Sequence, residues 1–504
     1  SYFYLHKSVP KTTSGITRSA HLLKAMMAFR HLLVTEQLAP EKTKTGYLCM
    51  EPYKWMFNSC RIPVAGEDVS TSFDPAAHQH VIVVRNGHFF AVDLVNKMTG
   101  KELSVAEIEV QLDRIMNDPR TQKMASAPVG AFTAANRDAW LKNREALLSG
   151  PSAEQNRKAL EKIESGIIVL ALDSGKPVTF NERGVAVYGG DARNRFFDKQ
   201  QIVVSENGAS GYIGEHSMMD GSQTLRLNNF MVSALEAGKI ELGGPSSGSV
   251  LDDPEYLSFD VNADLSNASN AAGQDFASLM DEQDMSVLDF TAYGKEAIKQ
   301  YKCSPDAWAQ MCIQLAFYKM FGHPCATYEA AQTRKFKLGR TETIRSCSLE
   351  SLAFCQAMQD TNATDAERYE KFQAAVTRHV KNAKEAAEGA GVDRHLFGLK
   401  RLIQQGEEPP ALFRDPMNAQ SGTWILSTSQ ISSEVFDAWG FGEVTPKGFG
   451  VAYAIKNNAL TFTIMCLKKV HSASRFTFFL NEAGIELRAM HDRLNQAKSA
   501  SPKL

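Results

Sequence analysis

Apolar residues recur along the chain with two different periods, and stretches of the two kinds alternate. Residues 17–37 (TRSAHLLKAMMAFRHLLVTEQ) carry apolar side chains at helical spacing, whereas residues 80–95 (HVIVVRNGHFFAVDLV) form two β-rich runs around Asn86 and Gly87. An Asn-Gly pair between such runs favours a two-residue hairpin turn. A second hairpin is predicted for residues 200–214, QQIVVSENGASGYIG. Alternating helical and strand patterns predict an α/β fold in which helices cover β-sheets.

Several helix boundaries are marked by particular residues. Residues 222–238 (SQTLRLNNFMVSALEAG) predict a helix that ends at a glycine. In SPDAWAQMCIQLAFYKMF, Ser304 is the expected N-cap and Pro305 the first helical residue. Residues 364–388 predict a long charged helix that ends at Gly389.

One segment has the composition of a link between domains. Residues 241–256 (ELGGPSSGSVLDDPEY) are rich in Gly, Pro and Ser, which favours an irregular connection. We therefore predict a domain boundary near residue 258, with domains at 1–258 and 259–504.

Composition excludes several classes of protein. The 504 residues are 43% hydrophobic and 22% charged with a net charge of −2, so two or more soluble cores are expected and a nucleic-acid partner is not. The eight cysteines include no CxxC pair, which predicts reduced core residues and no zinc site. No apolar run approaches the ~20 residues of a transmembrane helix.

The two ends of the chain bear on its compartment. The sequence begins SYFYLHKSVP without an initiator Met and ends SPKL. A truncated or processed N-terminus is expected, and a lost transit peptide stays open. SPKL resembles the peroxisomal S-K-L signal weakly, because Pro502 stands where a small residue is preferred.

The segment GEHSMMDG holds the first candidate for chemistry. His216 follows a predicted strand, and an imidazole there can act as a general base near neutral pH. Asp220 can orient the imidazole or pair with a cation such as Arg394. The alternative is a histidine without a catalytic role.

Two further segments favour the binding of anions. Lys295 and Lys299 are four residues apart and share one face if helical, an arrangement suited to the phosphates of a nucleotide. The segment CATYEAAQTRKFKLGRTETIRS is dense in hydroxyls and arginines, including Tyr328 and Thr341, and can hold a carboxylate or phosphate. The alternatives are a solvated lysine face and an ordinary polar loop.

A fixed cation and a set of hydroxyls complete the candidates. Arg394 in GVDRHLFGLK precedes an apolar run, so partial burial or a structural ion pair is expected. In WILSTSQIS three hydroxyls, on Ser427, Thr428 and Ser429, end a strand-like run and can stabilise an oxyanion, or simply close the strand.

The sequence resembles the choline/carnitine O-acyltransferases. The resemblance rests on CMEPYKWMFNSCRIP, NRFFDK, GEHSMMDG, YGK, SPDA, CATYEAA, LGRTETIRS, DRHLFGLK, LSTSQ and PKGFG, which occur in the family order across nearly the whole chain. It implies two similar α/β domains, each a mixed β-sheet covered by helices, with an active-site tunnel between them. The family's usual N-terminal segment is expected to be missing.

The resemblance also implies an activity: reversible transfer of a short acyl group, acetyl above all, between CoA and the hydroxyl of carnitine, without an acyl-enzyme. CoA is then a cosubstrate, no cofactor is bound permanently, no metal is needed, and a monomer in mitochondria or peroxisomes is expected. A medium-chain carnitine acyltransferase, a choline acetyltransferase and an inactive CoA- or acyl-carnitine-binding protein are the alternatives.

Each candidate receives a role by its match to the family. His216 matches the general base, Asp220 the acidic position after it, Ser429 the oxyanion donor and Trp439 the residue that limits the acyl pocket. The CoA positions are Lys295, Lys299, Asp306 and Gln430, and the carnitine positions are Tyr328, Thr341, Arg394, Ser427 and Phe441. Ala330 and Val380 depart from the family, and each removes one expected contact, to carnitine and to CoA respectively.

Overall fold

The fold is given by a computed structural model that describes residues 1–10, 13–244 and 251–500. It divides into unit 1 and unit 2. Unit 1 consists of Ser1–Lys42, Met50–Asp281 and Val435–Asp437, and unit 2 of Thr43–Cys49, Glu282–Glu434 and Ala438–Leu504. The SPKL signal and part of the Gly/Pro/Ser-rich segment lie outside the described residues.

Unit 1 is built on an eight-stranded sheet with the order β11-β7-β6-β8-β9-β10-β1-β16. Its central strands β6, β8 and β9 are parallel, and the flanking pairs are antiparallel. The strands are β1 (Tyr2–His6), β6 (His80–Arg85), β7 (His88–Asp93), β8 (Val169–Asp173), β9 (Gln201–Ser205), β10 (Ser210–Gly214), β11 (Glu255–Leu257) and β16 (Phe436–Gly440), the last through Val435–Asp437.

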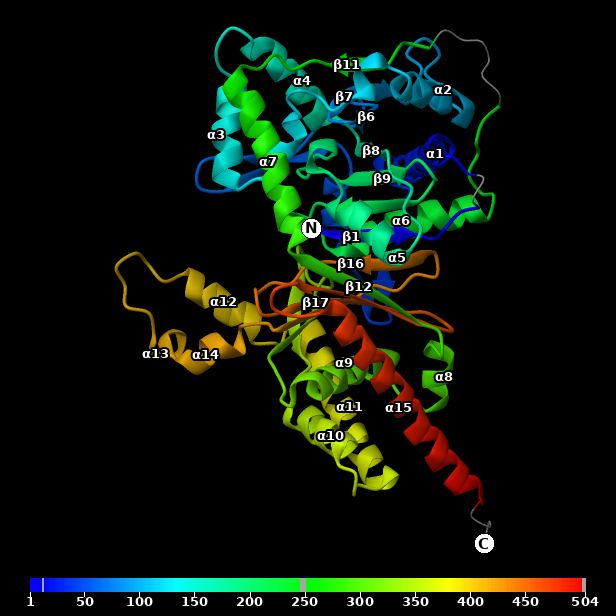
Figure 1. The fold of residues 1–504 in the computed structure, drawn as a ribbon, viewed down its shortest axis with the longest axis vertical. Helices are drawn as coiled ribbons and strands as arrows, with labels where there is room; N and C mark the ends of the chain where they lie inside the picture. Colours follow the sequence, from blue (N-terminus) through cyan, green and yellow to red (C-terminus); the bar gives the residue numbers. More distant parts are fainter. Residues whose placement is uncertain (11–12, 245–250, 501–504) are drawn as a thin grey trace. The chain divides into compact units, whose positions relative to one another are not determined.

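Helices surround this sheet, as Figure 1 shows. They are α1 (Gly15–Val34), α2 (Val105–Met116), α3 (Arg137–Leu147), α4 (Ala153–Ser165), α5 (Phe180–Gly184), α6 (Gly221–Glu236) and α7 (Ala263–Asp281). Short helical turns are η1 (Glu51–Trp55), η2 (Pro119–Gln122), η3 (Val129–Ala134), η4 (Val185–Gly189) and η5 (Ala192–Asn194). Because both faces are covered, strands β6, β9 and β10 are buried along their whole length.

The division between the units lies at Asp281 and Glu282, whereas the sequence favours residue 258. Strand β11 pairs with β7, and helix α7 packs against η3, so both segments belong to unit 1. Turn composition marks where the chain is irregular, but packing decides which unit a segment joins.

Unit 2 contains a six-stranded mixed sheet with the order β12-β18-β17-β15-β13-β14. Its strands are β12 (Gln283–Phe290), β13 (Thr327–Gln332), β14 (Thr341–Arg345), β15 (Leu426–Gln430), β17 (Phe449–Ile455) and β18 (Leu460–Leu467). Two small sheets elsewhere pair β2 (Lys42–Thr43) with β3 (Gly46–Tyr47) and β4 (Ser59–Pro63) with β5 (Asp68–Ser72).

The core of unit 2 lies between this sheet and a group of helices. Helix α9 is buried over most of its length and packs against α10, α11 and α15, while α12, α13 and α14 follow one another away from the sheet (Figure 1). The helices are α8 (Lys295–Gln300), α9 (Pro305–Phe321), α10 (Leu349–Gln359), α11 (Asp365–Ala387), α12 (Asp393–Arg401), α13 (Ala411–Arg414), α14 (Pro416–Ser421) and α15 (Ala473–Ala500).

The local predictions are confirmed in detail. Asn86 and Gly87 form the β6–β7 turn with φ of 48° and 76°, and the Ser304 side chain accepts a hydrogen bond from the Ala307 amide as the N-cap of α9. All eight cysteines, which lie in the described part of the chain, are free. No helix among the described residues is long and apolar enough to cross a membrane.

Candidate active site

His216 lies on the irregular segment between β10 and α6 in unit 1, with 47% of its side chain exposed. Its Nδ1 is 2.7 Å from the carbonyl oxygen of Met219. A carbonyl oxygen can only accept a hydrogen bond, so Nδ1 carries the proton and Nε2 keeps its lone pair in the neutral ring. This is the tautomer that a general base at Nε2 requires.

Asp220 has a weaker connection to the imidazole. Its Oδ1 is 3.8 Å from the His216 Nδ1, which is too long for a hydrogen bond. At this distance the carboxylate does not fix the direction of the ring. Orientation comes from the Met219 carbonyl.

Tyr2 supplies a second contact that the sequence did not reveal. Its ring packs edge-on against the His216 ring, with the centroids 5.1 Å apart and the planes at 89°. The hydroxyls of Tyr2 and Thr224 on α6 are 2.7 Å apart. The buried tyrosine is therefore held at its hydroxyl by Thr224, while its ring contacts His216. The imidazole is therefore confined on one face by a rigid neighbour.

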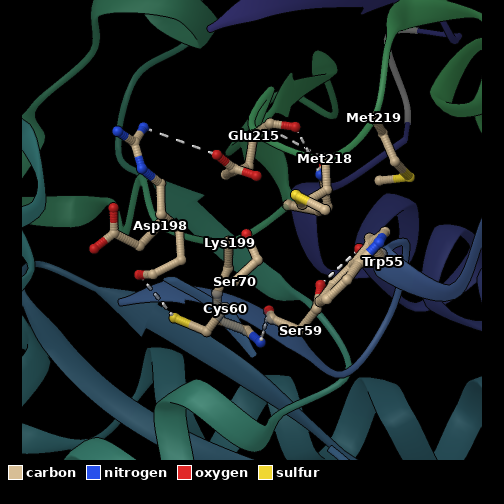
Figure 2. Close-up of a pocket in the computed structure, with 11 residues that line it drawn as sticks. Trp55, Ser59, Cys60, Ser70, Asp198, Lys199, Glu215, Met218 and Met219 are labelled. Atoms are coloured by element: carbon tan, nitrogen blue, oxygen red, sulfur yellow. Dashed lines mark hydrogen bonds and ion pairs between the residues drawn. The ribbon is translucent and has the colours of Figure 1, made fainter. Parts of the chain in front are cut away.

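A cavity of about 620 Å³ opens beside His216 within unit 1. Figure 2 shows the adjoining pocket, in which Glu215, Met218 and Met219 from the His216 segment face Asp198 and Lys199. Polar and charged groups line much of the cavity and the adjoining pocket. Residues of the NRFFDK segment form one wall of both.

The NRFFDK segment acts as structural support. Asp198 accepts two hydrogen bonds from Arg137, of 2.7 and 3.2 Å, and one from Trp140 Nε1. The Lys199 ammonium donates to the carbonyls of Ser59 and Glu164. Burial raises the pKa of Asp198 to about 6 despite Arg137, and lowers the pKa of Lys199 to about 8.

In unit 2, strand β15 carries the S-T-S segment. Successive side chains of a strand point to opposite faces, so Ser427 and Ser429 share one face and Thr428 lies on the other. The Thr428 Oγ1 donates to the Tyr328 carbonyl at 2.8 Å and accepts from Gln310 Nε2 at 2.9 Å. The sequence grouped all three hydroxyls, but Thr428 is committed to the core and only the two serines share a face.

Three predicted carnitine residues meet in unit 2. The Arg394 Nη2 donates to the Thr341 Oγ1 at 3.0 Å and to the Tyr328 hydroxyl at 3.3 Å, and its Nε donates to the Thr341 carbonyl at 3.0 Å. Arg394 is exposed, whereas the sequence predicted partial burial. One guanidinium and two hydroxyls, gathered from α12, β13 and β14, suit a carboxylate.

The lysine pair lies on α8 as the spacing predicts. Lys295 is half-buried, and Lys299 is exposed and 3.6 Å from the Glu296 carboxylate. The backbone amide of Lys295 donates to the Lys456 carbonyl, so the start of α8 is tied to the end of β17. The short, anchored helix thus presents one exposed and one half-buried lysine, an arrangement suited to a phosphate.

Asp306 is half-buried and belongs to a polar cluster in unit 2 whose other members, Glu329 and His379, are buried. Its carboxylate accepts a hydrogen bond from the Tyr453 hydroxyl at 2.7 Å, and the same hydroxyl lies 3.4 Å from Glu329. His379 Nε2 is 2.7 Å from the other Glu329 oxygen. One ligand atom each of Asp306, Glu329 and His379 falls within 4.8 Å of the others.

The charges of this cluster perturb one another. Burial, followed by the charge of Glu329, raises the pKa of Asp306 to about 7, although His379 opposes the rise. Burial disfavours a charged His379, but the hydrogen bond and charge of Glu329 outweigh it, so the pKa of His379 is raised. The Asp306 carboxyl therefore takes up or releases its proton near neutral pH.

Replacing Asp306 with asparagine is expected to stabilise the protein at neutral pH but not at acidic pH. The unfolded carboxyl ionises near pH ~4, while the folded one keeps its proton up to about pH 7. The wild type thus loses stability as the pH rises through this window. Asparagine has no such proton and still accepts from Tyr453. We expect a gain on the order of 1–2 kcal/mol at pH 8 and none at pH 4.

Urea unfolding at both pH values tests this expectation. Asp289→Asn, at an exposed position of β12, is the matched control and should change stability equally at both pH values. A difference between Asp306→Asn and wild type that stays constant from pH 4 to pH 8 would contradict the expectation.

Comparisons with known proteins bear on these groups. Residues 1–482 match the family described as choline/carnitine O-acyltransferase. The chain is 33% identical to a mitochondrial carnitine O-acetyltransferase of Saccharomyces cerevisiae, over 99% of this chain and 76% of the relative. It is 31% identical to the human carnitine O-acetyltransferase, over 95% and 78%, and 29% identical to the mouse choline O-acetyltransferase, over 97% and 78%.

The chain belongs to the choline/carnitine O-acyltransferase family. The predicted family membership and the α/β fold with two sheet-and-helix units are thereby confirmed. The protein is an acyltransferase, and its candidate residues fall into a base in unit 1 and anion-binding groups in unit 2.

Two aromatic residues of this acyltransferase lie next to the S-T-S strand. The buried Trp439 donates through Nε1 to the Tyr453 carbonyl at 2.9 Å, and Tyr453 is the register partner of Gln430. The rings of Trp439 and Phe441 are 5.5 Å apart. Trp439 is therefore held against β17, the strand that pairs with the one carrying Ser429.

Some residues of this acyltransferase escaped sequence reasoning. Glu329 occupies a buried position of β13. A glutamate on the buried side of an alternating strand could have indicated a polar cluster in the core. His379 lies on the apolar stripe of α11 with Phe372 and Val376, and a histidine on such a stripe could have indicated the same cluster. The Met219 carbonyl and Tyr2 carried no such signal, because their contacts depend on long-range packing.

Proposed function

We propose that this protein reversibly transfers an acetyl group between CoA and the hydroxyl of carnitine. The observation that carries the proposal is the cluster of Arg394, Tyr328 and Thr341. It offers a cation and two hydroxyls at 3.0 and 3.3 Å from one guanidinium nitrogen. Carnitine has a carboxylate that needs such a partner, and choline has none.

His216 is the proposed general base. Its Nε2 removes the proton from the carnitine hydroxyl while that oxygen attacks the thioester carbonyl of acetyl-CoA. When the tetrahedral intermediate collapses, the C–S bond breaks and the CoA sulfur takes the proton back from Nε2. No acyl-enzyme forms in this proposal, because the carnitine oxygen attacks the thioester carbonyl directly. The Met219 hydrogen bond supports this role by holding the proton on Nδ1.

The tetrahedral intermediate carries a negative oxygen that requires a donor. Ser429 is proposed for this role, and its partial exposure on β15 leaves the hydroxyl available. Ser427, on the same face, is assigned to carnitine. Phe441 offers an aromatic face to the trimethylammonium group, which has no N–H to donate.

CoA is proposed to bind as a cosubstrate along α8 and the end of β15. Lys295 and Lys299 are assigned to the phosphates of CoA. Gln430, which is exposed, is assigned to a more central part of the CoA molecule. Asp306 was matched to the same segment. Asp306 is hydrogen-bonded to Tyr453 in the polar cluster. We therefore assign it an indirect role in CoA binding, in which it holds the start of α9 in place.

Release of CoA thiol from acetyl-CoA, followed with DTNB, tests the proposed function directly. Carnitine is expected to stimulate release strongly, choline weakly, and neither addition should matter without acetyl-CoA. Stronger stimulation by choline than by carnitine would favour a choline acetyltransferase. Binding of CoA without stimulated release by either acceptor would favour an inactive binding protein.

Replacing Trp439 with glycine is expected to change the acyl-chain preference. Removing a large buried side chain beside the Ser429 strand leaves room for a longer chain, so kcat/KM for octanoyl-CoA relative to acetyl-CoA should rise by about tenfold or more. Trp439→Phe, which keeps most of the volume, is the control. If wild type already prefers octanoyl-CoA, a medium-chain acyltransferase is the better description.

The compartment and the oligomeric state complete the proposal. We expect a monomer in mitochondria, in peroxisomes or in both. The Saccharomyces cerevisiae relative is named as mitochondrial, which supports the first location. Light scattering coupled to gel filtration tests the oligomeric state, and imaging of the tagged natural protein tests the location.

A further inference from the structure

The side chain of Gln200 holds both backbone polar groups of the residue before His216. Its Oε1 accepts a hydrogen bond from the Glu215 amide at 3.1 Å, and its Nε2 donates to the Glu215 carbonyl at 2.9 Å. The ladder between β9 and β10 has its last pair at Gln201 and Ile213. The carboxamide of Gln200 thus satisfies the backbone N–H and C=O of Glu215, as the backbone of a neighbouring strand does inside a sheet.

A third hydrogen bond fixes the direction of this carboxamide. The Tyr212 hydroxyl donates to the Gln200 Oε1 at 2.7 Å, and both side chains are buried. Two donors meet the oxygen and one acceptor meets the nitrogen, so an inverted amide would lose both hydrogen bonds to the Glu215 backbone. Gln200 lines the pocket of Figure 2 together with Glu215 and Lys199.

The anchored peptide leads directly into His216. With its N–H and C=O both held, Glu215 has little freedom in φ and ψ, and the Glu215 carbonyl belongs to the peptide plane that ends at the His216 nitrogen. Beyond this point the segment up to α6 has no regular secondary structure. The anchor before His216 and the Met219 carbonyl after it therefore determine where the ring stands.

We propose that Gln200 is a positioning residue for proton transfer by His216. The inference rests on the proposed acyltransferase reaction and adds to it a residue outside the family motifs quoted above. Proton transfer needs the base within hydrogen-bond reach of the hydroxyl, and a displacement of ~1 Å can lower a rate by about 100-fold. The three hydrogen bonds of the Gln200 carboxamide go to Glu215 and Tyr212, so we expect Gln200 to act on kcat through His216.

Gln200→Leu, compared with Gln201→Leu, tests the proposal. Gln201 is the matched control because it is also buried and its Oε1 accepts a hydrogen bond from the Phe196 amide instead of the Glu215 amide. Both variants should lose thermal stability. Gln200→Leu should also lower kcat by about 10- to 100-fold with the KM values of carnitine and acetyl-CoA within about twofold, whereas Gln201→Leu should keep kcat within about threefold.

Gln200→Glu gives a readout that a purely structural role would not move. A protonated glutamic acid can donate to the Glu215 carbonyl as the amide does, and a carboxylate cannot. Burial raises the pKa of such a carboxyl. The ratio of the variant kcat to the wild-type kcat should therefore fall by about tenfold as the pH rises from 6 to 8. A ratio independent of pH would overturn the proposal.

The tautomer of His216, read from its ring nitrogens by NMR, decides the question without turnover. Wild type should show one tautomer protonated at Nδ1, and Gln200→Leu a mixture of both. An unchanged tautomer together with equal kcat in the two leucine variants would overturn the role of Gln200. Failure of wild type to transfer acetyl groups would instead overturn the proposed function, while the NMR comparison still decides on Gln200.

Discussion

Replacing His216 with alanine is expected to lower kcat for acetyl transfer by about 1,000-fold or more, because no other group takes the proton of the hydroxyl. The fold should persist, since 47% of the side chain is exposed. The KM or Kd of CoA should change little, because the proposed CoA residues lie on unit 2. Initial rates in the DTNB assay, with Tm as a check on folding, measure the effect.

His323→Ala is the matched control for this variant. His323 is an exposed histidine whose Nδ1 also lies near a carbonyl oxygen, that of Pro324. Its loss should leave kcat within about twofold, as is usual for a surface position. A His216→Ala protein that is folded and retains more than about a tenth of the wild-type kcat would refute the role of His216 as base.

Replacing Arg394 with asparagine is expected to raise the KM of carnitine by about 10- to 100-fold, since a hydrogen bond between charged partners contributes ~1.5–3 kcal/mol. The KM of acetyl-CoA should change little. Turnover with choline, which has no carboxylate, should be unaffected or rise relative to carnitine. Steady-state kinetics with each acceptor varied at saturating acetyl-CoA measure both effects.

Arg401→Asn separates the role of position 394 from a general loss of positive charge. Arg401 lies on the same helix, α12, and its guanidinium stacks over Phe397. It should leave the carnitine KM unchanged within about twofold. An equal rise in KM for both variants would point to long-range attraction of the substrate instead of a carboxylate contact. No rise for Arg394→Asn would remove the main support for carnitine as acceptor.

The pattern of the sequence determined the local elements of this protein. Asn86 and Gly87 predicted a hairpin turn because both residues accept positive φ, and Ser304 predicted a helix start because its hydroxyl satisfies an amide. Both signals depend on a few neighbouring residues, so they survive any arrangement of the rest of the chain. The ordered family segments then identified the acyltransferase family.

The chemical details of the candidate site depended on tertiary structure. The spacing of His216 and Asp220 suggested a pair, but at 3.8 Å the orienting partner is the carbonyl of Met219. The run Ser427–Thr428–Ser429 suggested three equivalent hydroxyls, but strand alternation turned Thr428 toward Gln310. Backbone carbonyls and side-chain direction leave no mark in a residue pattern.

What the sequence by itself determined is therefore the family and the kinds of elements, and it supplied the candidate side chains for the chemistry. Tertiary structure alone decided which nitrogen of His216 carries the proton, that Asp306 and Glu329 share the Tyr453 hydroxyl, and that Gln200 holds the backbone of Glu215. The reason is physical: periodicity and capping are short-range properties of a chain, whereas hydrogen bonds between residues distant in sequence exist only after the strands and helices have packed.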